Sequence, residues 1–423
     1  MSVAFPIVSW ARGSNIYEVN IRQYTKEGTI NAFAGHLPRL KEMGVAILWL
    51  MPITPISVAK RQGSWGSYYA ASSYTDIDPL YGTSGDFKNL ITQAHSLDMK
   101  VIIDWVANHT GYDHQWTTQY PDFYHKDELG NFTGLHGWID VIDLNYNVPA
   151  MRAAMITSMK HWIKAFDIDG FRCDMARTVP LDFWLEARAE CDALKSLLWL
   201  AECEVFDYHE VFDITYGWEG MRALDKYFST GESGLTDVKN IFKEYAKYPA
   251  GALKLLFTSN HDENTYTGTE YEKYGLSAKA VAVFTCTWPG IPLIYSGQEL
   301  PNKNRLSFFE KDEIGWEGTP LLHNFYRTLL DLRRKNRAMQ EGASVLLLNT
   351  SHQDIFAYLC RKEKDKVLVV LNLGKERTGF TFDHPAASGS YTELFTNASV
   401  HLNRKQSYSF AAGQFQVFHL TCP

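Results

Sequence analysis

Four acidic residues stand at or near the ends of short apolar runs in this 423-residue chain, namely Asp104, Asp174, Glu202 and Asp262. From Asp174 to Glu202 is roughly 30 residues and from Glu202 to Asp262 roughly 60, which is one and two units of a strand followed by a helix. The carboxyl ends of parallel strands meet at one edge of a sheet, so these side chains should converge. A pair of carboxyl groups, one a nucleophile or base and the other a proton donor, is what cleavage of a glycosidic bond requires.

The alternation of side chains along a strand predicts which neighbours share a face with these acids. In GFRCD, Arg172 and Asp174 should point into the interior of a barrel of such strands, while Cys173 points out toward the covering helices. In AEC, Glu202 points in and Cys203 points out, so both cysteines are expected to be packing residues. An arginine on the same face as Asp174 should keep that carboxyl ionised and oriented, as a nucleophile requires.

Apolar runs rich in β-forming residues alternate with amphipathic stretches over most of the chain, and this pattern predicts a closed parallel (β/α)8 barrel of the TIM type, an α/β fold. Two of the stretches, 149–166 and 319–336, have the apolar period of a helix. The expected strands are 16–21, 45–53, 100–106, 168–174, 197–204, 211–218, 253–260 and 291–297.

Two regions depart from the alternating pattern. Residues 109–145, after the third strand, are rich in aromatic residues, Gly, Asp and His, which indicates a small subdomain inserted beside the barrel mouth. Residues 339–423 contain only short β-type runs between turn-like segments, which predicts a C-terminal antiparallel β-sandwich domain. The catalytic barrel domain is therefore predicted to span residues 1–338.

Composition excludes several classes of partner. The net charge of −7 is small for this length, which argues against nucleic acid or an anionic membrane as the main partner. No segment approaches about 18 uninterrupted apolar residues, so none is expected to span a membrane. Aromatic residues make up 14% of the chain; they could pack the core or stack on sugar rings.

The cysteines and the first residues of the chain bear on the cellular compartment in which the protein is expected. The six cysteines form no Cys-x-x-Cys pair and are expected to be reduced thiols. The first residues lack the parts of a signal peptide, which predicts a cytoplasmic protein, or a secreted one if a leader has been removed. The cysteines are Cys173, Cys191, Cys203, Cys286, Cys360 and Cys422.

With these residues in hand, the chain resembles the α-amylase family of glycoside hydrolases over nearly its whole length. Each motif alone is modest, but their order and their spacing by strand and helix are specific. The segments similar to the family's are GSYYAASSYTDIDPLYGT (66–83), DWVANH (104–109), IDLN (142–145), GFRCD (170–174), LAEC (200–203), TSNHDEN (258–264) and GIPLIYSGQE (290–299).

The resemblance implies a role for each matching position. Asp174 would attack the anomeric carbon, Glu202 would act as acid and then base, and Asp262 would stabilise the distorted transition state. Arg172 would also orient Asp174, and Tyr69, rather than its neighbour Tyr68, would stack under the sugar ring. The positions expected to bind substrate are Tyr69, Asp104, His109, Arg172 and His261.

The chemistry requires no cofactor, but some relatives hold a structural calcium ion between barrel and subdomain. Asn108 and Asp143 occupy the matching positions, whereas Thr178 stands where many calcium-dependent relatives have His. Calcium takes six to eight oxygen ligands, so two are too few, and both residues could instead cap loops. The metal site is left open.

The function that follows is a retaining, endo-acting hydrolase of α-1,4-glucosidic bonds in starch, glycogen or maltooligosaccharides, working as a monomer through a covalent glucosyl-enzyme. A transglycosylase or a small-maltodextrin or cyclomaltodextrin hydrolase of the same fold would use the same carboxylates. A non-catalytic glucan-binding relative is a further alternative, against which the three intact acids argue.

Overall fold

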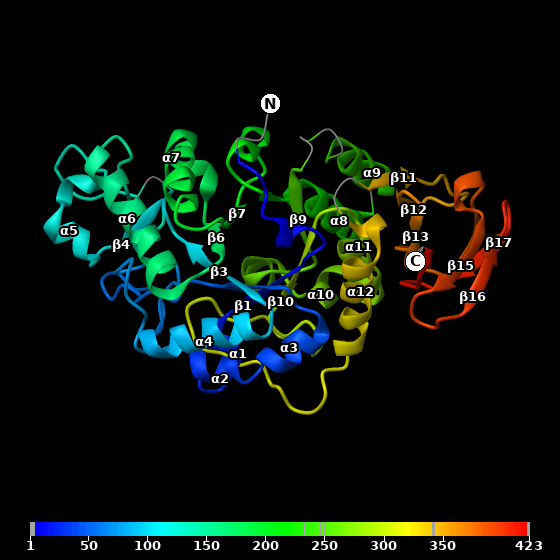
Figure 1. Cartoon of the computed structure of the whole chain (residues 1–423), viewed down its shortest axis with the longest axis horizontal. Coiled ribbons are helices and arrows are strands. Elements are labelled where there is room, and N and C mark those ends of the chain that lie inside the picture. Colours follow the sequence, from blue (N-terminus) through cyan, green and yellow to red (C-terminus); the bar gives the residue numbers. More distant parts are fainter. Residues whose placement is uncertain are drawn as a thin grey trace.

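The computed structural model describes residues 5–134, 136–231, 234–245, 248, 251–340 and 343–420, and its centre is a closed barrel of eight parallel strands (Figure 1). The order around the barrel is β1-β10-β9-β8-β7-β6-β3-β2. All eight strands fall inside the predicted runs, so the predicted barrel is confirmed. They are β1 Ile16–Val19, β2 Ile47–Leu50, β3 Lys100–Trp105, β6 Gly170–Cys173, β7 Leu198–Ala201, β8 Ile214–Tyr216, β9 Leu253–Phe257 and β10 Ile291–Tyr295.

Strand register brings the acids to one level. β3 and β6 pair so that Asp104 lies opposite Arg172, and β6 and β7 pair so that Cys173 lies opposite Ala201. Asp174 and Glu202 each follow directly, at the carboxyl ends of neighbouring strands. The register therefore places side by side the two carboxyl groups that the sequence spacing predicted to meet.

Helices surround the barrel, but not evenly. Between β7 and β8 the fully described connection contains only a 3-10 helix, η4 Phe206–Glu210. The helices are α1 Ile21–Tyr24, α2 Ile30–Ala34, α3 Leu37–Met43, α4 Ser84–Ser96, α5 Gln115–Gln119, α6 Pro149–Phe166, α7 Leu181–Asp192, α8 Trp218–Thr230, α9 Gly234–Tyr245, α10 Glu270–Tyr274, α11 Ala278–Thr287 and α12 His323–Lys335.

The two helices expected from their period are α6 and α12. α6 has the predicted bounds, with Pro149 at its first position, where the missing N–H costs nothing. Its apolar stripe, including Met155 and Trp162, is fully buried. α12 begins at His323 rather than at 319, after a turn at residues 321 and 322.

The inserted subdomain is built on a two-stranded antiparallel sheet, in which β4 His109–Gly111 pairs with β5 Val141–Asp143. α5 and the 3-10 helix η2 Pro121–Phe123 complete it, and in Figure 1 it lies at the opposite end of the molecule from the C-terminal domain. His114 fixes the start of α5, because its Nδ1 accepts a hydrogen bond from the backbone N–H of Trp116 at 3.1 Å.

The buried His114 should make the subdomain sensitive to acid. Burial lowers its pKa to about 3, whereas an unfolded histidine titrates near 6.5. Between these values the unfolded chain binds one more proton, so this residue lowers the free energy of unfolding by about 2 kcal/mol from pH 7.5 to 5. His114→Asn keeps a cap acceptor and removes the proton site. Denaturant titrations should show that the variant loses less stability over this range than the parent; equal losses would contradict the assignment.

The C-terminal domain is all-β, as predicted. Its larger sheet has the order β11-β12-β13-β18-β15-β16, and the pair β14-β17 faces it across an apolar cluster that includes Phe380, Phe410 and Leu368. The one strand not predicted, β16, has a single buried residue and hence little apolar pattern. The strands are β11 Ser344–Leu347, β12 Ile355–Lys362, β13 Asp365–Asn372, β14 Thr378–Thr381, β15 Gly389–Glu393, β16 Ser399–Leu402, β17 Ser407–Phe410 and β18 Phe415–Leu420.

Most large aromatic side chains serve the core rather than a surface. Trp49, Trp105, Trp162, Trp184 and Trp199 are buried. Within the described residues, no helix combines the length and the apolar character needed to cross a membrane. The described cysteines are buried free thiols, and Cys422 lies outside the described residues.

Candidate active site

A cavity of about 270 Å³ opens at the carboxyl ends of the barrel strands, between the barrel and the subdomain. It brings together all three candidate catalytic acids and three of the five candidate binding residues. The other two, Asp104 and Arg172, lie below its floor. The lining residues are Gln62, Ser67, Tyr69, His109, Trp138, Asp140, Val141, Asp174, Met175, Glu202, His261, Asp262, Tyr266, Phe308 and Phe309.

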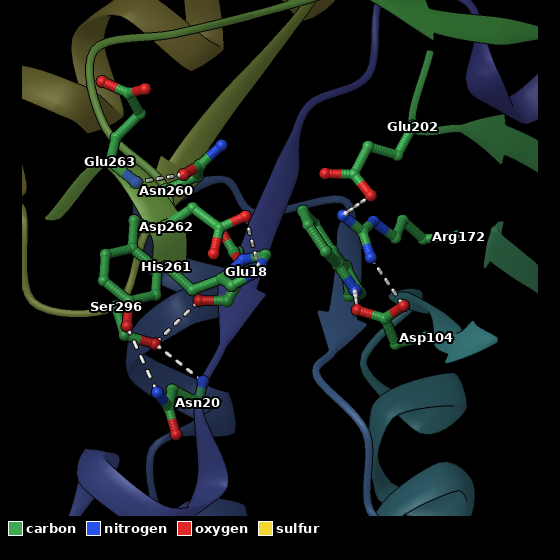
Figure 2. Close-up of polar contacts among 12 residues, drawn as sticks. Glu18, Asn20, Asp104, Arg172, Glu202, Asn260, His261, Asp262, Glu263 and Ser296 are labelled. Atoms are coloured by element: carbon green, nitrogen blue, oxygen red, sulfur yellow. Dashed lines mark hydrogen bonds and ion pairs between the residues drawn. The ribbon is translucent and has the colours of Figure 1, made fainter. Parts of the chain in front are cut away.

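The guanidinium of Arg172 holds the acids of the site together from below (Figure 2). Its Nη1 donates hydrogen bonds of 2.9 Å to Oδ1 of both Asp104 and Asp174, and its Nη2 forms an ion pair of 2.9 Å with Oε2 of Glu202. The side chains of Arg172 and Asp104 are fully buried. Arg172 therefore positions the acids, and its own side chain has no exposed surface.

The ionisation of Asp174 differs from what the sequence predicted. Burial raises its pKa well above the usual range, and the charge of Glu202 raises it further, while Arg172 lowers it. One guanidinium faces three carboxyl groups, so it cannot offset the burial of all of them. Burial therefore outweighs the arginine at Asp174 and raises the pKa of that carboxyl group.

The backbone beside Asp174 fixes Glu202. The N–H of Met175 donates a hydrogen bond of 2.9 Å to Glu202 Oε2. Met175 has a φ of 44°, in the left-handed region that side chains rarely occupy, so this turn is strained. The conformation of this turn points the backbone N–H of Met175 toward the carboxyl group of Glu202.

His261, in the loop after β9, contacts three partners. Its Nδ1 lies 2.5 Å from Oε1 of Glu18 on β1, its Nε2 lies 2.8 Å from the Tyr69 hydroxyl, and Nε2 also lies 3.3 Å from Oδ2 of Asp262. Burial lowers the pKa of His261, but the charges of Asp262 and Glu18 outweigh it and raise the pKa to about 9.

Tyr69 forms a wall of the cavity, and Tyr68 does not. The Tyr69 ring stacks on Phe308 with 6.1 Å between ring centroids, and its hydroxyl donates a hydrogen bond of 3.1 Å to Asp104. Tyr68 points elsewhere and packs its ring against the guanidinium of Arg22 at 3.8 Å.

His109 lies on the subdomain side of the cavity, at the start of β4. Its ring meets that of Trp138 edge to face, with 5.4 Å between centroids. Burial lowers its pKa to about 3, so the ring is neutral and one of its nitrogens can accept a hydrogen bond.

The two candidate calcium ligands face each other, since the Asn108 amide donates a hydrogen bond of 3.2 Å to Asp143 Oδ1. Among the described residues no group of three or more His, Cys, Asp or Glu side chains could hold a metal ion. Asn108 points its N–H₂ group, rather than its oxygen, at the carboxylate of Asp143. These two side chains therefore do not fit a calcium site in this arrangement, and no step of the chemistry depends on calcium.

Sequence reasoning missed several residues of the site. Glu18 could have been found, because it occupies an inward position of the first predicted strand, where a charged side chain needs a partner. Trp138, Phe308 and Asp140 come from loops, and Tyr266 comes from the short π-helix η5 Glu263–Thr267; none of them carries a periodic signal.

A closed barrel whose strand ends present a cluster of carboxyl groups in one cavity defines a glycosidase-like site, and comparison with known proteins agrees. Residues 11–129 and 198–329 match the family model described as alpha amylase, catalytic domain, and residues 345–418 match that of the maltogenic amylase C-terminal domain. The catalytic match covers more than half of the chain, so the protein belongs to the α-amylase family of glycoside hydrolases.

Solved structures agree over the whole length. A noncanonic maltogenic α-amylase from Thermotoga neapolitana is 30% identical, with a TM-score of 0.89 over 97% of this chain and 99% of its own. An α-amylase from Lactobacillus plantarum is also 30% identical, with a TM-score of 0.88 over 98% and 100%. Among curated proteins, α-amylase 3 of Dictyoglomus thermophilum is 26% identical over 89% of this chain and 87% of its own.

Proposed function

We propose that the protein hydrolyses α-1,4-glucosidic bonds within short maltooligosaccharides, with retention of configuration at the anomeric carbon. The observation that carries the proposal is the convergence of Asp174, Glu202 and Asp262 on one cavity above the Arg172 guanidinium. Retaining glycosidases use one carboxylate as nucleophile and a second carboxyl group as acid and then base.

In the first step the Asp174 carboxylate attacks the anomeric carbon, the glycosidic C–O bond breaks, and the leaving oxygen takes a proton from Glu202. In the second, Glu202 removes a proton from water, whose oxygen displaces Asp174 and restores both groups. The contacts of Glu202 with Met175 and Arg172 use Oε2, which leaves Oε1 to carry the transferred proton.

The remaining groups would bind the sugar at the bond that breaks. Asp262 and the histidines at 109 and 261 present polar groups to its hydroxyls, and the Tyr69 ring offers an apolar face. As an oxocarbenium-like charge develops, the negative charge of Asp262 would stabilise it.

The size and walls of the cavity support short α-glucans as substrates. A cavity of about 270 Å³ lies just below the usual range for small-molecule sites, about 300–1,000 Å³. Trp138 and Tyr266 line it yet are 42% and 59% exposed, so further sugar units could stack on them outside the cavity. The match to a maltogenic amylase C-terminal domain supports the same substrate class.

A time course on maltoheptaose and on starch tests this proposal. We expect maltoheptaose to be cleaved at internal bonds with a kcat/KM above that for starch, and the first product to appear as the α-anomer by proton NMR. A β-anomer would contradict the double displacement. Products longer than maltoheptaose would show instead that a sugar hydroxyl, rather than water, resolves the glucosyl-enzyme.

A further inference from the structure

Four residues from four separate segments form one chain of hydrogen-bonding groups through the site. Glu18 Oε1 lies 2.5 Å from His261 Nδ1, and His261 Nε2 lies 2.8 Å from the Tyr69 hydroxyl. That hydroxyl donates a hydrogen bond of 3.1 Å to Asp104 Oδ2. Figure 2 shows Glu18 beside His261.

The direction of each hydrogen bond follows from the inventory of donors. Tyr69 has one hydroxyl proton, and it is given to Asp104, which as a carboxylate can only accept. The Tyr69 oxygen must then accept from His261, so Nε2 carries a proton. At the other end Nδ1 faces the Glu18 carboxylate, which also accepts, so Nδ1 carries a proton as well. A histidine with protons on both nitrogens is a cation.

We propose that Glu18 is a positioning residue that holds His261 as an imidazolium ion, so that a fixed positive charge and an Nε2–H donor face Asp262 and the sugar-binding cavity. The role in catalysis rests on the proposed function, whereas the charge state of His261 does not. Neither Glu18 nor a charge on His261 was among the expectations from sequence.

Opposing effects act on Glu18. It is fully buried and its Oε2 has no hydrogen-bond partner among the described residues; burial raises its pKa, whereas the charges of His261 and Arg172 lower it. His261 faces Asp262 in its own loop and packs edge to face on Trp49 of β2. The pKa of His261, raised to about 9 by Asp262 and Glu18 against its burial, agrees with a cation at neutral pH.

Charged and titratable groups from the neighbouring strands and loops face the Glu18–His261 pair. The acids are more numerous than the cations, which makes a second positive charge beside Arg172 favourable. The groups are Asp104 on β3, Arg172 on β6, Tyr216 on β8, Asp262 after β9, Tyr295 on β10 and Tyr69 after β2.

Histidine-selective NMR tests the charge directly and needs no substrate. The ring signals of His261 are identified by their loss in His261→Asn and followed from pH 5 to 10. In the parent we expect both ring nitrogens protonated at pH 7. In Glu18→Gln, which keeps the shape but removes the charge, the midpoint should fall by at least about one pH unit. A neutral ring in the parent, or an unchanged midpoint in the variant, would overturn the proposal.

Glu299→Gln is a matched control. Glu299 is another fully buried glutamate, held by Tyr17 at 2.8 Å and by Arg39 at 2.9 Å, and it does not line the cavity. Its loss should leave the His261 midpoint where it is. A shift equal to that of Glu18→Gln would mean that any buried carboxyl loss disturbs the site, and the positioning role would fall.

Activity on maltooligosaccharides gives the second readout. Glu18→Gln should lower kcat/KM by about 10- to 100-fold, the usual effect of losing a hydrogen bond to a charged group, and most strongly on the alkaline side of the pH profile. Glu18→Asp keeps the charge one methylene further away and should recover part of the loss. If the parent proves inactive on glucans while the NMR result holds, the proposed substrate is wrong and the charge assignment stands.

Discussion

Replacing Asp174 with asparagine should lower kcat on maltooligosaccharides by on the order of 10³-fold or more, and Glu202→Gln should do the same, because the two groups act as one unit. Neither change removes a group from the apolar core. Both variants should therefore unfold at denaturant concentrations close to that of the parent, with circular dichroism confirming the fold.

A substrate with a good leaving group separates the two roles. Fluoride leaves without a proton, so a maltosyl fluoride needs the nucleophile but not the acid. We expect Glu202→Gln to regain much of its rate of glycosyl-enzyme formation on α-maltosyl fluoride, and Asp174→Asn to regain none. Recovery by Asp174→Asn instead would exchange the two assignments.

Asp213→Asn serves as the control for loss of a buried carboxyl group. Asp213 pairs with Arg188 at 3.0 Å on the outer side of the barrel, away from the cavity. This variant should cost stability and leave kcat within a few fold of the parent. If kcat fell as far as in Asp174→Asn, the catalytic assignment would lose its support.

How far the sequence could predict this site depends on the element that carries each residue. Asp174 and Glu202 follow strands whose period and spacing are plain, so both their convergence and their inward direction could be predicted. Cys173 and Cys203 are buried in the apolar core, as expected of packing residues. Strand geometry fixes the directions of the one or two residues that follow a strand.

Residues in loops follow no such periodic rule, so the sequence does not predict where their side chains point. Trp138 lines the cavity from a loop of the subdomain, and it cannot be placed without knowing how the subdomain folds against the barrel. Tyr266 lines it from the short π-helix η5, which has no periodic signal. The connection from β7 to β8 likewise departs from the regular alternation, since it contains a 3-10 helix in place of an α-helix.

The depth of a residue within the barrel was the second property that the sequence could not predict. The sequence predicts that Asp104 and Arg172 bind substrate, and the structure leaves both without exposed side-chain surface and outside the cavity lining. A strand position predicts the direction of a side chain, not its distance from the barrel mouth. Because Arg172 pairs with three buried or partly buried acids, its loss should affect both stability and rate.

Arg172→Met should lower the free energy of unfolding by about 3–5 kcal/mol, because it leaves Asp104 and Asp174 buried without their cation. It should also lower kcat by about 100-fold, since a small displacement of Asp174 and Glu202 is enough to misalign the attack. Arg172→Lys should not restore the parent, because an ammonium group cannot replace the fixed fork that meets three carboxyl groups at 2.9 Å.

The pH dependence and a double variant test the cause. Without Arg172 the folded-state pKa values of Asp104 and Asp174 rise further, so the folded chain binds more protons than the unfolded chain, and the stability deficit of Arg172→Met should shrink as the pH falls from 8 to 5. Adding Asp104→Asn to Arg172→Met removes one stranded charge, so the double variant should be more stable than the sum of the two single changes predicts. Additive losses with no pH dependence would mean that Arg172 contributes by packing alone, and the account of the site as three acids held by one cation would fail.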